Sequence, residues 1–237
     1  MSRKRGDFRA SDAGTPFARS RSNERVPGDK PMNLATAGTK LTYDDFVLFP
    51  EDGQRHELID GEHYVSPSPK IPHQQIAGNL HWLLRRHLES DPRGQVFFAP
   101  LDVIFSRFDV VEPDLLYVSH ERAEEVLSGL WVEGSPDLVI EIGSRSTRTR
   151  DETIKLQLYE RAGVAEYWIV DPRTESVRVF RRGAHGYEGS VELSKDACAS
   201  VTTPLLPGFA ATVADIFKNA RVANTRVDGA RIKRQRT

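Results

Sequence analysis

The spacing of apolar residues changes its period several times between residues 41 and 217, and each period predicts one kind of element. The segment RHELIDGEHYVSP, residues 55–67, alternates apolar and polar positions on both sides of Asp60-Gly61. This dipeptide is typical of a two-residue hairpin turn. We therefore expect a β-hairpin with Glu57 in its first strand.

A helical period follows in residues 72–90, where apolar residues recur at intervals of three and four. This spacing predicts a long amphipathic helix with His73 and Gln74 in its first turn. Two strands are expected next, QVFFAPLDVIF at residues 95–105 and VVEPDLLYV at residues 110–118, and the second contains Asp114.

The segment PDLVIEI, residues 136–142, is the most apolar strand and is expected at the centre of a sheet. Residues 147–163 then read as a helix closed by Gly163, and EYWIVDP, residues 166–172, as a strand. This order predicts a right-handed parallel crossover. The further expected elements are short helices in residues 42–49, 120–130 and 206–217 and antiparallel strands in residues 176–182 and 186–194.

The pattern as a whole predicts an α/β fold with a central mixed β-sheet flanked by helices. Of the 237 residues, 38% are hydrophobic, which is enough for one domain, expected at residues 37–217. Residues 1–36 and 218–237 are poor in aliphatic residues and are expected to be disordered, with Met32 as an alternative start. The longest apolar runs are far too short to cross a bilayer, so we expect a soluble, cytoplasmic protein that binds no membrane.

Charge divides the chain into three parts. The net charge of −1 combines basic ends with an acidic middle, because residues 37–217 hold 18 basic and 29 acidic side chains. Proteins that bind nucleic acid through its phosphates usually carry the opposite sign. The charge therefore counts against a nucleic-acid-binding domain, although the basic ends could themselves attract nucleic acid.

Three acids, Glu57, Asp114 and Glu141, lie in or beside apolar strands, and Lys155 lies on the helix after the third. Two carboxylates on neighbouring strands repel each other unless a cation or a proton lies between them. Mg²⁺ fits such a pair, because it needs only one or two carboxylates and completes its shell with water and phosphate oxygens. Cys198 is the only cysteine, which excludes a cysteine-based zinc site. Asp151 lies four residues before Lys155, so the two can pair on one helix face.

The loop GSRSTRTR, residues 143–150, offers hydroxyl and backbone N–H groups for a phosphate at Ser144, Ser146 and Thr147. Structural interpretations remain open for all of these residues. Glu141 could be an edge residue or half of an ion pair with Arg148 or Lys155, and Asp114 could simply end a turn.

The order of several segments resembles that of the Uma-two family of restriction-endonuclease-like proteins, which is similar to the PD-(D/E)XK nuclease superfamily. The resemblance covers about residues 41–217. It rests on RHELIDGE, SPKIPHQQ, VFFAPLDV, VVEPDLLYVS, GSPDLVIEIGSRSTRTRD, KLQLYERAGVAEYWIVDP and TTPLLPGF.

The resemblance implies a restriction-endonuclease-like core in which Asp114 and Glu141 are the motif acids and Glu57 an upstream acid. The superfamily lysine usually lies two residues after the second acid, where this chain has Gly143. Lys155 would then be its replacement.

His73 and Gln74 match a His-Gln pair of the family and are candidates for contact with the substrate. Arg145 departs from the family pattern, which usually has proline there, and this puts the conformation of the loop in question.

The sequence thus predicts a Mg²⁺- or Mn²⁺-dependent endonuclease acting on DNA, with Asp114, Glu141 and Glu57 as metal ligands and Lys155 as a further catalytic residue. A homodimer is expected, since nucleases that cut both strands are often symmetric. The alternative is a nuclease-fold protein without catalytic activity that acts as a binding or regulatory module.

Overall fold

The computed structural model describes residues 39–127, 129–144 and 147–220. The N-terminal segment predicted to be disordered, Ser146, and residues 221–237 of the predicted C-terminal tail lie outside these ranges. Residues 218–220 continue from the last helix, and Ala220 is buried in the main core.

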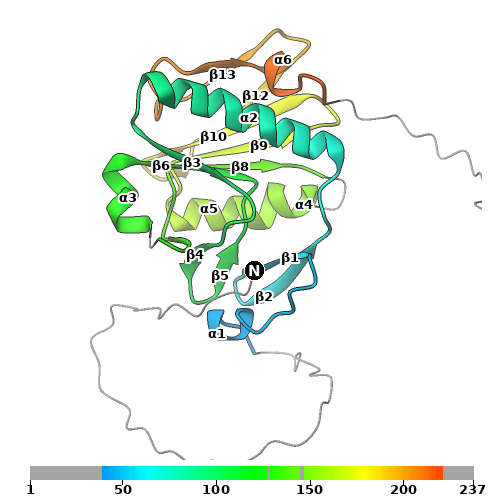
Figure 1. The fold of residues 1–237 in the computed structure, drawn as a ribbon, viewed down its shortest axis with the longest axis vertical. Helices are drawn as coiled ribbons and strands as arrows, with labels where there is room; N and C mark the ends of the chain where they lie inside the picture. Colours follow the sequence, from blue (N-terminus) through cyan, green and yellow to red (C-terminus); the bar gives the residue numbers. More distant parts are fainter. Residues whose placement is uncertain (1–38, 128, 145–146, 221–237) are drawn as a thin grey trace, which may run out of the picture.

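A seven-stranded mixed sheet forms the centre of the fold (Figure 1). β8 (Leu138–Ile142) and β9 (Glu166–Asp171) run parallel in its middle, as the crossover prediction requires. β6 (Leu115–Ser119) pairs antiparallel with β8, and β3 (Gly94–Phe98) forms the edge beyond β6. The other side is completed by β10 (Ser176–Gly183), β11 (Gly186–Tyr187) and β12 (Val191–Ser194).

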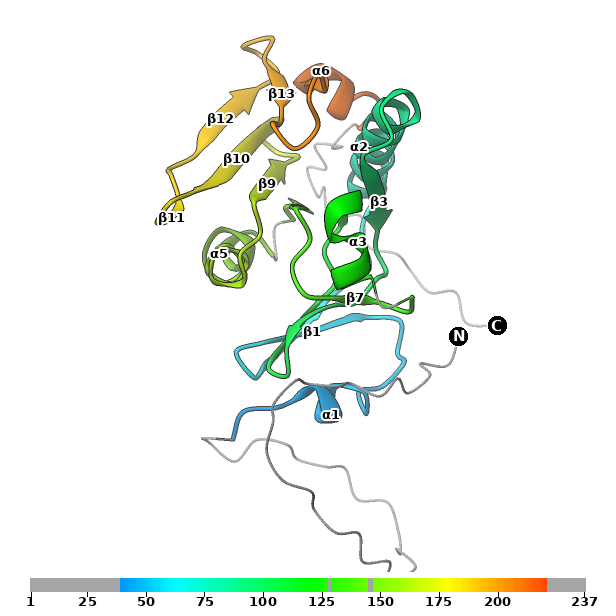
Figure 2. The same ribbon diagram turned by 90° about the vertical axis from the view of Figure 1, so that its left-hand side faces the viewer.

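Both faces of the central strands are buried, because alternate side chains enter different cores. Leu138 packs in the core that contains α2 (Ile71–Ser90), and Val139 in the core that contains α5 (Leu156–Ala162). Figures 1 and 2 show these two helices on opposite sides of the sheet. Double coverage explains why β8 is apolar at every position except Glu141.

A second, five-stranded sheet lies at the end of the molecule where α1 (Tyr43–Phe46) packs (Figure 2). The predicted hairpin is confirmed, and its Asp60-Gly61 turn has positive φ at both residues. The strands, in spatial order, are β2 (Glu62–Ser66), β1 (Arg55–Ile59), β5 (Asp109–Val111), β4 (Val103–Ser106) and β7 (Val132–Glu133).

The prediction of single continuous strands at residues 95–105 and 110–118 is wrong. Each segment breaks near a proline, Pro100 or Pro113, and passes from one sheet to the other. Proline has no N–H to donate to a strand ladder, so it ends the pairing at these points. The second break places Asp114 immediately before β6, where the two sheets meet.

The helix predicted at residues 147–163 is helical throughout its length but irregular. A π-helical turn, η1 (Asp151–Lys155), separates α4 (Arg148–Arg150) from α5. Asp151 and Lys155 are both buried, and Lys155 forms ion pairs with Glu57 and Glu141 instead of the predicted pair with Asp151.

The remaining predicted short helices are present as α3 (His120–Val126) and α6 (Val213–Ile216). A two-stranded ladder, β13 (Ser200–Thr202) with β14 (Ala210–Thr212), precedes α6. Within the part of the chain that the structure describes, every helix is too short or too polar to cross a membrane.

Candidate active site

The pairing of β6 with β8 brings Asp114 and Glu141 together. Leu115 lies opposite Ile140 in this ladder, so the next opposed positions are Asp114 and Glu141. Side chains at opposed positions lie on the same face with Cβ atoms about 5 Å apart. Asp114 is only 4% exposed and Glu141 only 3%. Two buried carboxylates therefore stand side by side where the sheet meets the solvent.

Both acids line a cleft of about 1040 Å³ between the N-terminal end of α2, the carboxyl end of β8 and the segment that contains α4 and η1. The cleft collects basic side chains in a domain that is acidic overall. Its charged lining residues are Arg55, Lys70, Arg148, Arg150, Lys155 and Arg173 on the basic side and Asp114, Glu141, Asp151, Glu152 and Asp171 on the acidic side.

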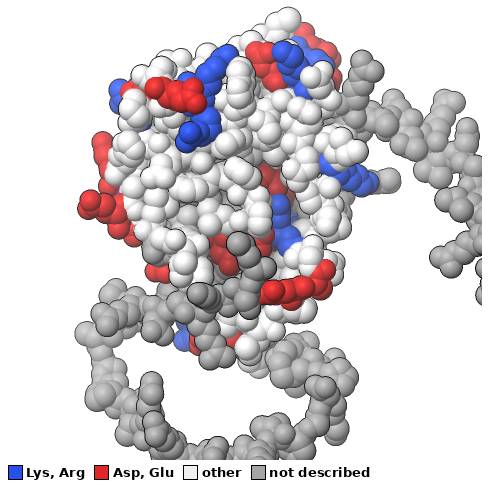
Figure 3. Space-filling model, viewed as in Figure 1, with Lys and Arg blue, Asp and Glu red and all other residues white. Residues whose placement is uncertain are grey.

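Elsewhere the surface agrees better with the acidic composition. On the face shown in Figure 3, acidic side chains gather along the edge formed by α3, and basic and acidic side chains are interspersed over the rest. The cleft nevertheless brings six basic side chains to one hollow, where five acidic side chains also lie.

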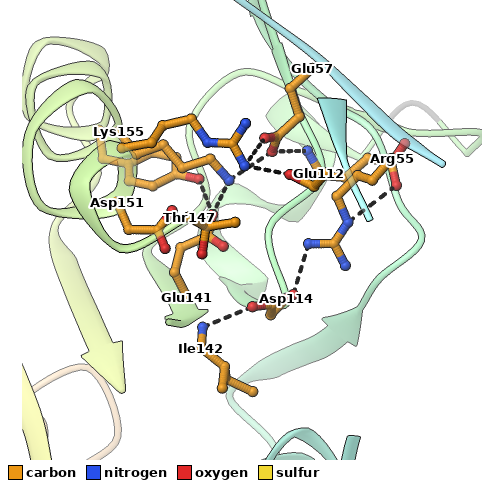
Figure 4. A network of polar contacts seen from close by, with 12 residues as sticks. Arg55, Glu57, Glu112, Asp114, Glu141, Ile142, Thr147, Asp151 and Lys155 are labelled. Atoms are coloured by element: carbon orange, nitrogen blue, oxygen red, sulfur yellow. Dashed lines mark hydrogen bonds and ion pairs between the residues drawn. The ribbon is translucent and has the colours of Figure 1, made fainter. Parts of the chain in front are cut away.

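Lys155 is buried between two carboxylates (Figure 4). Its Nζ lies 2.8 Å from Glu141 Oε1 and 2.7 Å from Glu57 Oε1, and only 1% of Lys155 is exposed. Burial alone would lower the pKa of Lys155, but the charges of Glu141 and Glu57 hold this pKa above its ordinary value. The ammonium group therefore stays charged at neutral pH.

Glu141 binds Lys155 and Tyr159 through the same oxygen, since the Tyr159 hydroxyl donates to Oε1 at 2.6 Å. Its Oε2 has no hydrogen-bond partner among the described residues, and the residue lines the cleft. Burial raises the pKa of Glu141 to about 7 against the lowering effect of the Lys155 charge, and the charge of Asp114 adds to the rise. The carboxylate is thus short of positive charge on its cleft side.

Both carboxylate oxygens of Asp114 have hydrogen-bond partners, unlike those of Glu141. Oδ1 accepts from Arg55 Nη1 at 2.8 Å, and Oδ2 accepts from the Ile142 backbone N–H at 2.8 Å. Nε2 of His73 lies 3.0 Å from the same Oδ2. Burial alone would raise the pKa of Asp114, but His73 and Arg55 hold it well below its ordinary range. Asp114 is therefore ionised throughout the physiological range.

Glu57 lies in β1 and forms an ion pair with Lys155. Besides Lys155 it accepts from the Glu112 backbone N–H at 3.2 Å and lies 3.4 Å from Arg150 Nη2. It does not line the cleft. Glu57 is thus an ion-pair partner of Lys155, and its role as a direct metal ligand stays a prediction.

The predicted substrate contacts separate into two groups. His73, Ser144 and Thr147 line the cleft, and the backbone N–H groups of Ser144 and Thr147 each donate to the other's hydroxyl, at 3.1 and 3.2 Å. Gln74 is exposed and lies outside the cleft lining.

Sequence reasoning missed Arg55, Asp151 and Tyr159 as members of the site. Arg55 stands two residues before Glu57 and Tyr159 four residues after Lys155, so the strand and helix periods place each on the same face as a predicted site residue. Asp151 lines the cleft, and burial raises its pKa to about 6. Its buried position follows from the π-helical turn, which the sequence does not signal.

The charges of this cluster fit a divalent cation. Five buried acids face three contacting cations, which gives a formal charge of −2 when His73 is neutral. The acids are Glu57, Glu112, Asp114, Glu141 and Asp151, and the cations are Arg55, Arg150 and Lys155. Within the described residues no group of three or more histidine, cysteine or acidic side chains is arranged to enclose a metal. The donor set suits Mg²⁺, which accepts two carboxylates with water, better than a metal that needs four protein ligands.

A mixed sheet with two acids at its solvent edge and a buried lysine beside them places the protein in the restriction-endonuclease-like class of folds. A family model named Uma2 and described as "Putative restriction endonuclease" matches residues 43–214, and the chain belongs to this family. Among curated proteins no significant sequence match is found.

The fold agrees with a solved relative. The crystal structure of "a putative nuclease belonging to DUF820 from Anabaena variabilis" is similar to this protein with a TM-score of 0.65 and 20% sequence identity, over 76% of this chain and 99% of that chain. The type IIG restriction endonuclease BpuSI matches with a TM-score of only 0.32 and 13% identity, over 65% of this chain and 17% of that chain. The first similarity supports the fold, and the second is too weak to carry an argument.

Proposed function

We propose that this protein is a Mg²⁺-dependent endonuclease that hydrolyses DNA phosphodiester bonds in the cleft. The observation that carries the proposal is the convergence of Asp114, Glu141 and Lys155 on one face of the sheet edge. Membership of a restriction-endonuclease family supports it.

Asp114 and Glu141 would hold Mg²⁺, or Mn²⁺ in its place, and Glu141 offers its unbonded Oε2 for this purpose. When bound, such a metal lowers the pKa of a coordinated water and offsets negative charge on the phosphodiester. The two carboxylates are rigid, because β6 and β8 fix their backbones. Preorganised ligands of this kind need no rearrangement during the reaction.

Lys155 supplies a fixed positive charge next to Glu141. Its ammonium group would stabilise the charge that develops on the phosphate and orient the attacking water. Glu57 and Tyr159 hold the arrangement, the first by its bond to Lys155 and the second by its bond to Glu141. Lys155 would thereby replace a lysine at position 143.

The substrate strand would lie along the basic residues of the cleft. Ser144 and Thr147 present hydroxyl groups beside the acids, and His73 approaches from the first turn of α2. Arg148, Arg150 and the other lining cations attract the phosphate backbone, and this local charge offsets the acidic remainder of the domain.

Plasmid nicking tests the proposal. Purified protein should convert supercoiled DNA to the open-circular form in Mg²⁺ or Mn²⁺ and not in chelator, and Asp114→Asn or Glu141→Gln should abolish the conversion. Glu166→Gln is the matched control, because Glu166 is a buried acid on neighbouring β9 outside the cleft. Equal nicking by all three variants would contradict the proposal.

The acidic charge of residues 37–217 favours a second candidate, a nuclease-fold module that binds a partner without cutting DNA. Titration calorimetry with Mg²⁺ separates the two. An intact carboxylate site should bind the metal and lose it in Asp114→Asn, whereas a binding module without this site should show neither effect.

A further inference from the structure

Arg55 occupies a special position in the cleft. It begins β1, and its guanidinium lies between two carboxylates (Figure 4). Nη1 donates to Asp114 Oδ1 at 2.8 Å, and Nε lies 3.9 Å from Glu112 Oε2. A cation therefore already sits on one of the two acids proposed to bind the metal.

The two oxygens of Asp114 differ in how replaceable their partners are. Oδ2 binds the Ile142 backbone N–H, which the strand fixes, and His73, which the first turn of α2 holds. Oδ1 has Arg55 as its partner among the described residues. An arginine side chain has several rotatable bonds, so Arg55 can leave Oδ1 without any movement of the backbone.

We propose that Arg55 holds the metal position on Asp114 in the metal-free protein, and that metal binding releases its guanidinium to a phosphate of the bound DNA. The inference rests on the proposed function, because it takes Asp114 as a metal ligand. The exchange replaces one cation by another on a carboxylate that stays ionised. The released guanidinium remains in the cleft and matches a phosphate group, which it can bind through two parallel N–H···O bonds.

Two consequences follow. Arg55 competes with the metal, so its removal tightens metal binding. Arg55 also becomes available to DNA only when the metal is present, so metal and DNA each strengthen the binding of the other.

The first consequence is tested by titration calorimetry with Mn²⁺ alone. Arg55→Gln should bind Mn²⁺ roughly tenfold more tightly than the wild type, the loss of one charge-assisted hydrogen bond being the reason. Arg173→Gln is the matched control, because Arg173 lines the same cleft and has no bond to Asp114. The control should change the affinity by less than about twofold, since a cleft-rim charge is screened.

The outcomes separate the two proposals. A wild type that binds no Mn²⁺ would contradict the proposed function itself. A wild type that binds Mn²⁺, with Arg55→Gln binding it equally or more weakly, would overturn the role of Arg55 and leave the proposed function standing. Equal tightening in Arg173→Gln would also overturn it, because the effect would then be general electrostatics.

A measurement on the wild type guards against a variant that fails to fold. The side-chain Nε–Hε signal of Arg55 in an NMR spectrum should shift on titration with Mg²⁺, while that of Arg173 should not. An unchanged Arg55 signal at saturating Mg²⁺ would refute the exchange.

The second consequence is tested with Ca²⁺, used as a metal that supports binding, and a short DNA duplex. Ca²⁺ should tighten duplex binding by the wild type at least about fivefold, and this coupling should fall toward unity in Arg55→Gln. Coupling of equal size in both proteins would overturn the transfer of Arg55 to phosphate.

Discussion

Replacement of Lys155 by methionine is the sharpest perturbation of the buried cluster. Methionine fills a similar volume but removes the charge that Glu57 and Glu141 share. Removing one partner of a buried ion pair typically costs about 3–5 kcal/mol, because the remaining charge is left uncompensated. Here two carboxylates lose their partner, so we expect a value at the upper end of this range.

For a domain of this size such a loss lowers the melting temperature by on the order of 10 °C. Urea denaturation followed by circular dichroism measures the free energy directly. Lys195→Met is the matched control, since Lys195 forms an ion pair with Glu175 at 2.6 Å on the surface and should cost at most about 0.5 kcal/mol.

The double variant Lys155→Met/Glu141→Gln removes Lys155 together with one of the two carboxylates that would be left uncompensated. It should recover about half of the lost stability, but it should not recover DNA nicking. A loss below about 1 kcal/mol in Lys155→Met would mean that the lysine is not the main counter-charge of these acids.

Two further predictions concern the same site. Because burial raises the pKa of Glu141 from 4.5 to about 7, the folded protein binds a proton there that the unfolded chain does not, so the free energy of unfolding should fall as the pH rises from about 4.5 to about 7. Urea denaturation across this range should show a smaller fall in the free energy of unfolding for Glu141→Gln than for the wild type. The same pH dependence in both proteins would contradict the raised pKa of Glu141. A Cβ at Gly143 would meet only the Val170 carbonyl oxygen at 3.5 Å, so the backbone there can carry a side chain. Lys155→Met should lower the nicking rate roughly 100-fold. Adding Gly143→Lys to this variant should raise the rate again by about tenfold. No gain in the double variant would show that a charge at position 143 cannot reach the reacting phosphate.

Much of the fold could be predicted from residue patterns because local periods dominate it. The β8 strand, the amphipathic α2 helix and the Asp60-Gly61 hairpin each carry a strong local signal. The prediction of two continuous strands was wrong, because an apolar run does not show where the chain leaves one sheet for another. Pro100 and Pro113 were the available signals for those breaks.

The candidate site was predictable in part for the same reason. The convergence of Asp114, Glu141 and Lys155 follows from strand order and from the helix after β8. The buried position of Asp151 depends on a π-helical turn, and the contact of Arg55 with Asp114 depends on how two sheets pack. Neither is encoded in a local pattern, so neither could be read from the sequence alone.

Asp114 and Glu141 are proposed to hold a divalent metal ion together in the cleft. Anomalous diffraction from crystals soaked in Mn²⁺ would locate this ion. We expect a Mn²⁺ peak bonded to one oxygen of each acid, with Arg55 displaced from Asp114. A map without a peak at these acids, with Arg55 still bound to Asp114, would contradict the proposal.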